Sequence, residues 1–242
     1  MTVEIIHLQF GHGGAIKGAY FADSFIRTDV PWFIGSKWGF SFMPQDTQTF
    51  SNVAAASLNV AANNLVIANS GGGGSVPKGF GIPIAMNSAV FPWDNGATLA
   101  LPQFSEIKIT GNAAVVNSGF GVGVLMDVNG GNCYSMRNSF TGSPVYRLER
   151  FVNGINSTLI ADAPCNIGDV MRLEVIPGAI ANALTMYINS VVVNTFNDND
   201  PTRSTFGIPG LVTNGTGAGG SFSYQLFKCG TLPQISTAND FP

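Results

Sequence analysis

The chain contains little charge. Lysine, arginine, aspartate and glutamate together make up 10% of its 242 residues, whereas about 25% is typical of globular domains. The net charge is −3 and the 11 basic residues are scattered, so the clustered basic patch of a nucleic-acid-binding protein is missing. Because copies with few charges repel one another weakly, we expect either permanent contact with neighbouring chains or a neutral, lectin-like surface.

Long apolar runs are also missing. No run approaches the roughly 18 residues of a membrane-spanning helix, although apolar residues make up 45% of the chain. The first residues include Glu4 and lack the basic segment and continuous apolar core of a signal peptide. These absences predict a protein without a membrane partner that is made in a cytoplasm.

Cysteine and histidine are scarce. The three cysteines, Cys133, Cys165 and Cys229, cannot all pair within one chain, and none forms a Cys-x-x-Cys motif. We expect free, buried thiols, with a single disulfide as the open alternative. The two histidines, His7 and His12, lie together near the N-terminus, where no catalytic triad is predicted around them.

The chain does contain clear alternation of apolar and polar residues. Residues 146–152, 171–175 and 184–188 alternate with a period of two, which is typical of antiparallel strands with one buried face. In the first of these segments Tyr146 and Leu148 are expected to face the core, and Arg147 and Glu149 the solvent. The following pair at 153–154, Asn-Gly, favours a two-residue hairpin turn.

The apolar face of each predicted strand must be buried against a second layer. The residues that we expect in this core are Phe25, Trp38, Leu65, Ile107, Val122, Val124, Met126, Tyr146, Leu148, Leu173, Val175, Leu184, Met186, Ile188 and Phe227.

Four short motifs carry a family resemblance. They are Asp-x-Phe-x-Arg at 23–27, Gly-x-x-Trp at 35–38, Gly-Asp-x-x-Arg-Leu-x-Val at 168–175 and Gly-x-Pro-Gly-Leu at 207–211. Together they resemble the concanavalin A-like, laminin G-like jelly-roll domains that many bacteriophage virion proteins carry. One departure is Ser190, which stands where the family's turn after residues 184–189 has glycine, and it leaves open whether that tight turn is kept.

The resemblance implies an all-β fold. The expected architecture is a concanavalin A-like jelly-roll sandwich of two antiparallel sheets over residues 19–230. An N-terminal arm over residues 1–18 and a C-terminal tail over residues 231–242 are expected to flank it.

Other parts of the chain fit this pattern less well. Residues 39–57 and 68–104 are expected to form long surface loops. The alanine-rich segment 53–62 overlaps a hairpin expected at 58–67, and its composition leaves a short helix open.

No constellation of residues predicts an enzyme. Members of the family that hydrolyse glycans place acidic residues two and three apart on one strand, and Glu4, Glu106, Glu149 and Glu174 form no such run. The glycine-rich segment 71–75 is not followed by the Gly-Lys-Ser or Gly-Lys-Thr of a phosphate-binding loop. We therefore expect a non-catalytic protein.

Candidate glycan-binding residues are two aromatic residues in the long loops, Trp32 and Trp93, and two polar residues expected on the solvent-exposed face of a strand, Arg147 and Arg150. An accessible tryptophan ring can stack on a sugar face, whereas a core or interface position remains the alternative for each ring.

No cofactor is expected unless calcium binds. The candidate calcium ligands are Asp198 and Asp200, because carboxylates suit Ca²⁺, and a solvated turn is the alternative for the same Asp-Asn-Asp cluster.

The first function hypothesis is a non-catalytic bacteriophage virion protein, namely a capsid decoration (cement) protein located in the virion. Its arm, with Val3, Ile5, Leu8 and Phe10, is expected to bind other virion proteins such as the major capsid protein by adding a strand to a sheet edge. A homo-oligomer is expected, with a trimer as one option. The alternative hypothesis is a glycan-binding lectin or tail-fibre adhesin that recognises a host surface glycan.

Overall fold

The structure is a computed structural model and contains only strands and turns in the part of the chain that it describes. That part comprises residues 20–23, 38–42, 56–61, 64–69, 75–83, 101–112, 118–127, 132–141, 143–216 and 220–232. The predicted arm residues Val3, Ile5, Leu8 and Phe10 lie outside it. The all-β prediction is confirmed for the described residues, and no helix suited to spanning a bilayer occurs among them.

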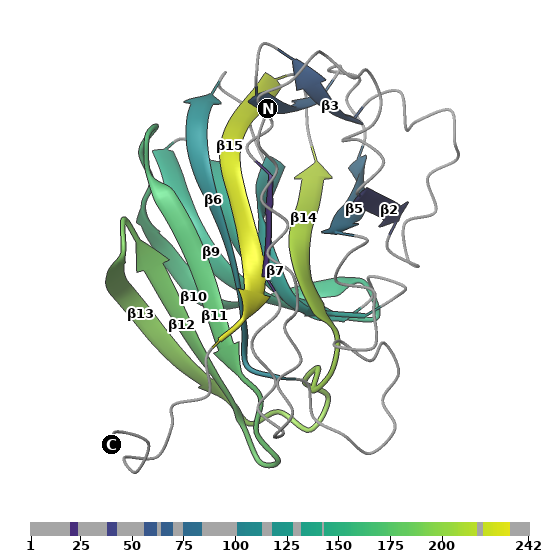
Figure 1. The fold of residues 1–242 in the computed structure, drawn as a ribbon, viewed down its shortest axis with the longest axis vertical. Helices are drawn as coiled ribbons and strands as arrows, with labels where there is room; N and C mark the ends of the chain where they lie inside the picture. The colour runs from purple at the N-terminus through teal and green to yellow at the C-terminus, as the bar shows by residue number, and fades with distance from the viewer. Residues whose placement is uncertain are drawn as a thin grey trace, which may run out of the picture.

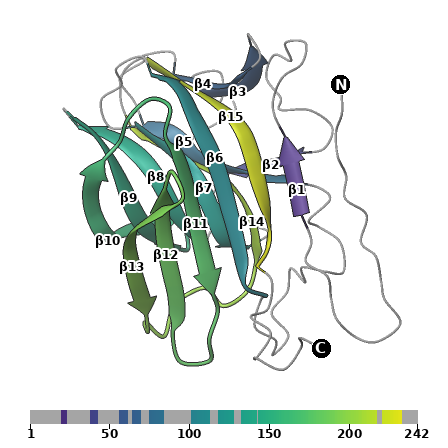
Figure 2. The ribbon, with the colours of Figure 1, turned by 60° about the vertical axis from the view of Figure 1, so that its left-hand side comes forward.

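The strands belong to two antiparallel sheets. The eight-stranded sheet has the order β13-β12-β11-β6-β15-β4-β3, with β1 also paired to β15, and the seven-stranded sheet has the order β10-β9-β8-β7-β14-β5-β2. Figures 1 and 2 show the two layers facing each other, with β13 as the outermost strand of the first. The strands are β1 (Tyr20–Asp23), β2 (Trp38–Phe42), β3 (Ala56–Ala61), β4 (Asn64–Asn69), β5 (Ser75–Pro83), β6 (Gln103–Asn112), β7 (Ser118–Met126), β8 (Cys133–Thr141), β9 (Ser143–Val152), β10 (Ile155–Pro164), β11 (Val170–Ile176), β12 (Asn182–Ile188), β13 (Val191–Asp198), β14 (Ile208–Thr216) and β15 (Gly220–Thr231).

Two hairpins close with two-residue turns. Asn153 and Gly154 join β9 to β10 with φ values of 50° and 78°, as the sequence predicts. Asn189 and Ser190 join β12 to β13 with φ values of 51° and 67°. The type I′ turn, which needs positive φ at both central residues, is therefore compatible with Ser190 in place of glycine.

The core lies between the two sheets. In β11 and β12 every second side chain is buried, as a period of two predicts for a strand with one dry face. The predicted core residues whose side chains the structure describes are confirmed as buried, and Ile188 packs partly buried against them. The buried ones are Ile107, Val122, Val124, Met126, Tyr146, Leu148, Leu173, Val175, Leu184, Met186 and Phe227.

Three tyrosine hydroxyls cross this core and link the sheets. Tyr134 donates a hydrogen bond to Asp198 at 2.6 Å, and Tyr146 donates to Asp169 at 2.9 Å. Tyr224 of the eight-stranded sheet donates to Asn138 of the other at 2.8 Å. These contacts identify the face of β8 and β9 that points inward, because the hydroxyls reach across to the opposite layer.

The structure corrects one expectation about the less regular segments and decides one open alternative. Residues 68–104 are not one long loop, because β5 lies within them and pairs with both β14 and β2. The helix option for residues 53–62 fails, because β3 pairs with β4 in a hairpin. At the predicted start of the tail, β15 runs to Thr231 and the Leu232 N–H donates to the Pro102 carbonyl at 2.8 Å.

Candidate functional site

The structure brings together three of the predicted site residues. Arg150, in β9, donates to both carboxylate oxygens of Asp198 at 3.0 Å and to Asp200 at 2.9 Å. The guanidinium thus lies where a cation between the two carboxylates would lie. A calcium ion at these two aspartates would have to displace it.

Asp200 is held as an anion by its own turn. Hydrogen bonds from the Thr202 hydroxyl and N–H, followed by the contact with Arg150, lower its pKa to about 2. No group of three or more His, Cys, Asp or Glu side chains that could hold a metal ion occurs among the residues that the structure describes. The cluster therefore joins β9 to the turn after β13.

The two predicted arginines lie on opposite faces of the seven-stranded sheet. Arg150 pairs in register with Tyr134, which points inward, whereas Arg147 pairs with Arg137. Because side chains alternate along a strand, Arg147 belongs to the outer face, where it is half-buried. Trp32 and Trp93 lie outside the described residues.

A buried ion pair lies on this outer face. The Arg137 side chain donates to Glu149 through Nε, and its Nη2 lies 2.6 Å from Glu149 Oε1. Asn156 adds a hydrogen bond to the same oxygen at 3.2 Å. The prediction that Glu149 faces solvent is wrong, because the side chain is fully buried. Its charge is tolerated there because each carboxylate oxygen accepts a bond from the guanidinium.

Sequence reasoning missed Arg137 as the partner of this carboxylate. The two residues come from neighbouring strands, so their pairing depends on the register between β8 and β9. The only sequence signal was the pair of charges in residues 147–149, and it was interpreted as a solvated face.

Further polar groups surround the ion pair. The Ser135 hydroxyl, which pairs in register with Glu149, is buried and has no hydrogen-bond partner within the described part of the chain. On the neighbouring edge strand β10, Asn156 is half-buried and Thr158 is exposed. We call Arg147, Asn156 and Thr158 the polar rim, because they border the buried pair on the side that reaches solvent.

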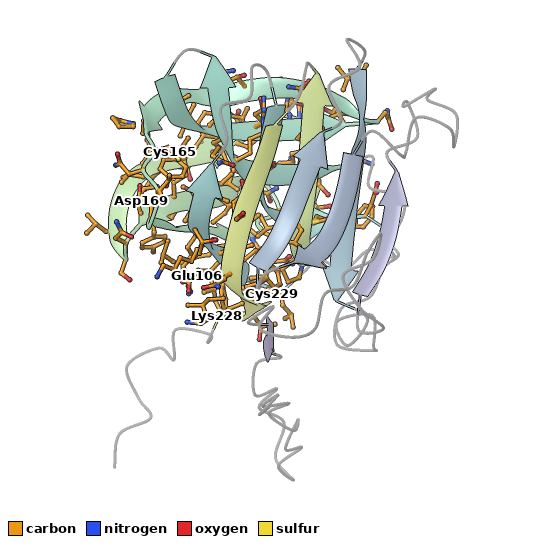
Figure 3. The ribbon with its side chains drawn as sticks, turned by 90° about the horizontal axis from the view of Figure 1, so that it is seen from above. Glu106, Cys165, Asp169, Lys228 and Cys229 are labelled. Atoms are coloured by element: carbon orange, nitrogen blue, oxygen red, sulfur yellow. The ribbon has the colours of Figure 1, made fainter. Side chains whose placement is uncertain are left out.

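A second charged surface lies on the outer face of the eight-stranded sheet. Glu106 lies between Arg172, at 3.5 Å, and Lys228, at 3.4 Å. Arg172 also pairs with Glu174 at 2.6 Å and stacks 3.9 Å from the ring centroid of Phe104. Figure 3 shows Glu106 and Lys228 beside each other. These contacts form a row of alternating charge across the middle strands β15, β6 and β11.

The described acidic side chains all accept hydrogen bonds or ion pairs from neighbours. Asp169 is representative: burial opposes its charge, but hydrogen bonds from Asn166, Asn189 and Tyr146 lower its pKa. The acidic residues with such partners are Glu106, Asp127, Glu149, Asp169, Glu174, Asp198 and Asp200.

The thiols are as predicted, free and buried. Burial raises the pKa of Cys165 to about 11, and it also raises the pKa of Cys133 and Cys229. Figure 3 shows Cys165 near Asp169, and Cys229 near Lys228. A thiol with a raised pKa is a poor nucleophile at neutral pH.

Comparison with known proteins identifies the fold. No protein-family model and no curated protein matches the chain. Among solved structures, the CBM2 module of the evolved Dit of Lactobacillus casei BL23 phage J-1 aligns with a TM-score of 0.53 at 12% identity. The alignment covers 91% of this chain and 99% of that one. The chain has a jelly-roll fold of two antiparallel sheets.

Other solved structures share the jelly roll. A Bacteroides ovatus xyloglucan GH43B protein aligns with a TM-score of 0.50 at 14% identity, over 87% of this chain. The jelly roll described here spans only 39% of that protein's length. Basic winged bean lectin aligns with a TM-score of 0.46 at 10% identity over 90% of this chain and all of the lectin. At such identities the shared property is the fold.

Proposed function

We propose that this chain is a non-catalytic, glycan-binding jelly-roll module of a bacteriophage virion protein. The observation that carries the proposal is mutual coverage: the chain aligns with 99% of a phage CBM2 module but with 39% of the GH43B protein. A fold match over nearly the whole of that phage module supports a comparable role for this chain.

The state of the acidic side chains supports a binding role. Hydrolysis of a glycosidic bond needs one carboxyl group that can donate a proton and a second that is free to act as nucleophile or base. The described carboxylates instead accept hydrogen bonds or ion pairs from neighbouring side chains, and Glu149 is bound through both of its oxygens.

The polar rim is the proposed binding surface. Arg147, Asn156 and Thr158 offer donors and acceptors on one face, and the buried hydroxyl of Ser135 lies on the same face without a partner among described residues. Sugars present neighbouring hydroxyl groups that both donate and accept, so a cluster of mixed polar groups suits them.

A glycan array with the purified chain tests the proposal. We expect binding to at least one glycan without release of shorter sugars. Replacing Asn156→Ala and Thr158→Ala together should weaken binding at least about tenfold, since two neighbouring hydrogen bonds are lost. The matched control is Thr185→Ala with Thr195→Ala, a pair on the outer face of the other sheet.

Three results would contradict the proposal. These are the absence of binding to every glycan, turnover of a bound glycan, and equal losses in the two double variants.

Capsid decoration is the second candidate. The low charge of the chain favours a protein that assembles with neighbours, as does its edge strand β13, whose only charged residue, Asp198, is buried. Deletion of residues 1–18 separates this role from glycan recognition: a decoration protein should lose its attachment to capsids, whereas a glycan-binding module should keep its array profile.

A further inference from the structure

The free edge of β13 is unusually apolar. β13 pairs only with β12 in the described sheet, and Figure 1 shows it as the outermost strand of its layer. Val191, Val192 and Val193 are 63%, 51% and 40% exposed. Three consecutive exposed β-branched residues thus lie on an edge that pairs with no second strand among the described residues, which makes it a template for another strand. One backbone group of this edge, the Thr195 N–H, donates to Asn194 Oδ1 at 2.9 Å.

Most of the charged residues of this sheet lie away from its β13 edge, whereas most proteins place charged residues on their edge strands. Proteins normally place lysine, proline or other charged residues on edge strands to prevent pairing. Here β12 carries no charged residue, and the only one in β13 is Asp198, which is buried and bound to Arg150. The charged side chains lie on the middle strands instead, as Glu106, Lys108, Arg172, Glu174 and Lys228.

One protective device is present. The register between β12 and β13 shifts so that Met186 faces Asn194 and Tyr187 faces Val192, which leaves Val193 as a bulge. A bulge bends an edge strand locally. It leaves the segment from Asn194 to Asn197 regular and uncharged.

We propose that this edge pairs with the same edge of a second copy. An antiparallel pair of β13 strands about a two-fold axis would join two eight-stranded sheets into one continuous sheet. A two-fold interface places each surface against itself, so any net charge there would repel its own copy. An uncharged strand avoids that repulsion, and it offers no counter-charge to a charged partner. Cross-strand pairs of β-branched side chains favour the antiparallel arrangement.

Light scattering coupled to size-exclusion chromatography tests the interface over a series of concentrations. We expect a dimer that dissociates on dilution. The triple variant Val191→Lys, Val192→Lys and Val193→Lys should be monomeric throughout. The control is Ile180→Lys, which places one lysine at an 83% exposed apolar residue between β11 and β12, and it should leave the dimer unchanged.

A wild-type chain that is monomeric at every concentration would overturn the proposal, as would a dimer that survives the triple variant or is lost equally in the control. Circular dichroism checks that the variants fold. If the triple variant does not fold, hydrogen exchange of the wild type decides: amides of β13 should exchange more slowly as concentration rises, and unchanged rates would refute the pairing. Binding of soluble sugar by the monomeric variant is expected to persist, so this test and that of glycan binding fail independently.

Discussion

The buried pair of Arg137 and Glu149 is the clearest residue-scale determinant of stability. Replacing Glu149→Gln leaves the guanidinium buried without its counter-charge, which should lower the free energy of unfolding by roughly 3 to 5 kcal/mol. Urea unfolding measures this loss. The comparison variant is Glu174→Gln, whose partner Arg172 is 26% exposed, and it should cost about 1 kcal/mol or less. Similar losses in both variants would show that the pair on the seven-stranded sheet is not effectively desolvated.

Asp169 links stability to pH. Its pKa lies below the ordinary 3.8, because hydrogen bonds from Asn166, Asn189 and Tyr146 outweigh the opposing effect of burial. The stabilisation from a lowered carboxylate pKa is complete above the unfolded-state value and is lost as the pH falls through the folded-state value. Asp169→Asn should therefore lower stability by roughly 1 to 3 kcal/mol at neutral pH.

The difference between wild type and Asp169→Asn should shrink in acid, where the wild-type carboxylate is also protonated. Urea unfolding at neutral pH and in strong acid measures both values. A difference that does not depend on pH would mean that the lost hydrogen-bond geometry, and not the charge, accounts for the effect.

At the scale of elements, the β12–β13 turn holds Ser190 in a strained backbone conformation that glycine would relieve. Ser190 has a φ of 67°, a conformation that costs a residue with a side chain more than it costs glycine. Ser190→Gly should therefore raise the free energy of unfolding by roughly 0.5 to 1 kcal/mol, measured by thermal or urea unfolding. Ser157→Gly, in the exposed part of β10, should instead lower it by roughly 0.5 to 1 kcal/mol. Destabilisation by the Ser190 variant would indicate that the hydroxyl contributes more than the backbone strain.

The sequence best predicted those strands that have one buried, apolar face and one polar face toward solvent. β11 and β12 are of this kind, and both their strand identity and their buried residues are confirmed. β5 was missed because its residues, Ser75–Pro83, include two glycines and two prolines and show no alternation. β9 was predicted as a strand, but the burial of Glu149 depends on Arg137 from another strand, and no local pattern contains that information.

At the scale of the whole molecule, two sheets and one shared core could be predicted, whereas the order of the strands could not. Strand order depends on which distant segments pair, for example β14 between β7 and β5, and one sequence carries no direct record of such pairs. The resemblance to jelly-roll domains supplied the architecture. The candidate site was only partly predictable, because Arg147 and Arg150 were placed on one face and the register separates them.

The three cysteines report on whole-molecule unfolding. Cys133 lies in the seven-stranded sheet, Cys229 in the eight-stranded sheet, and Cys165 between β10 and β11. Because burial raises the pKa of each thiol, a thiol reagent should react slowly with the native protein. Since both sheets bury one core, labelling of Cys133 and Cys229 should rise at the same urea concentration, measured by mass spectrometry of the labelled peptides. Separate midpoints would mean that one sheet opens before the other.

The tyrosines that cross the interior have a mechanical consequence. Tyr134, Tyr146 and Tyr224 each anchor one layer to the other at a different point. If one sheet slid over the other, a tyrosine hydroxyl would be left without a hydrogen-bond partner in an apolar environment, which is energetically unfavourable. A domain with this interior should therefore resist shear between its two sheets up to a threshold force and then yield in a single step.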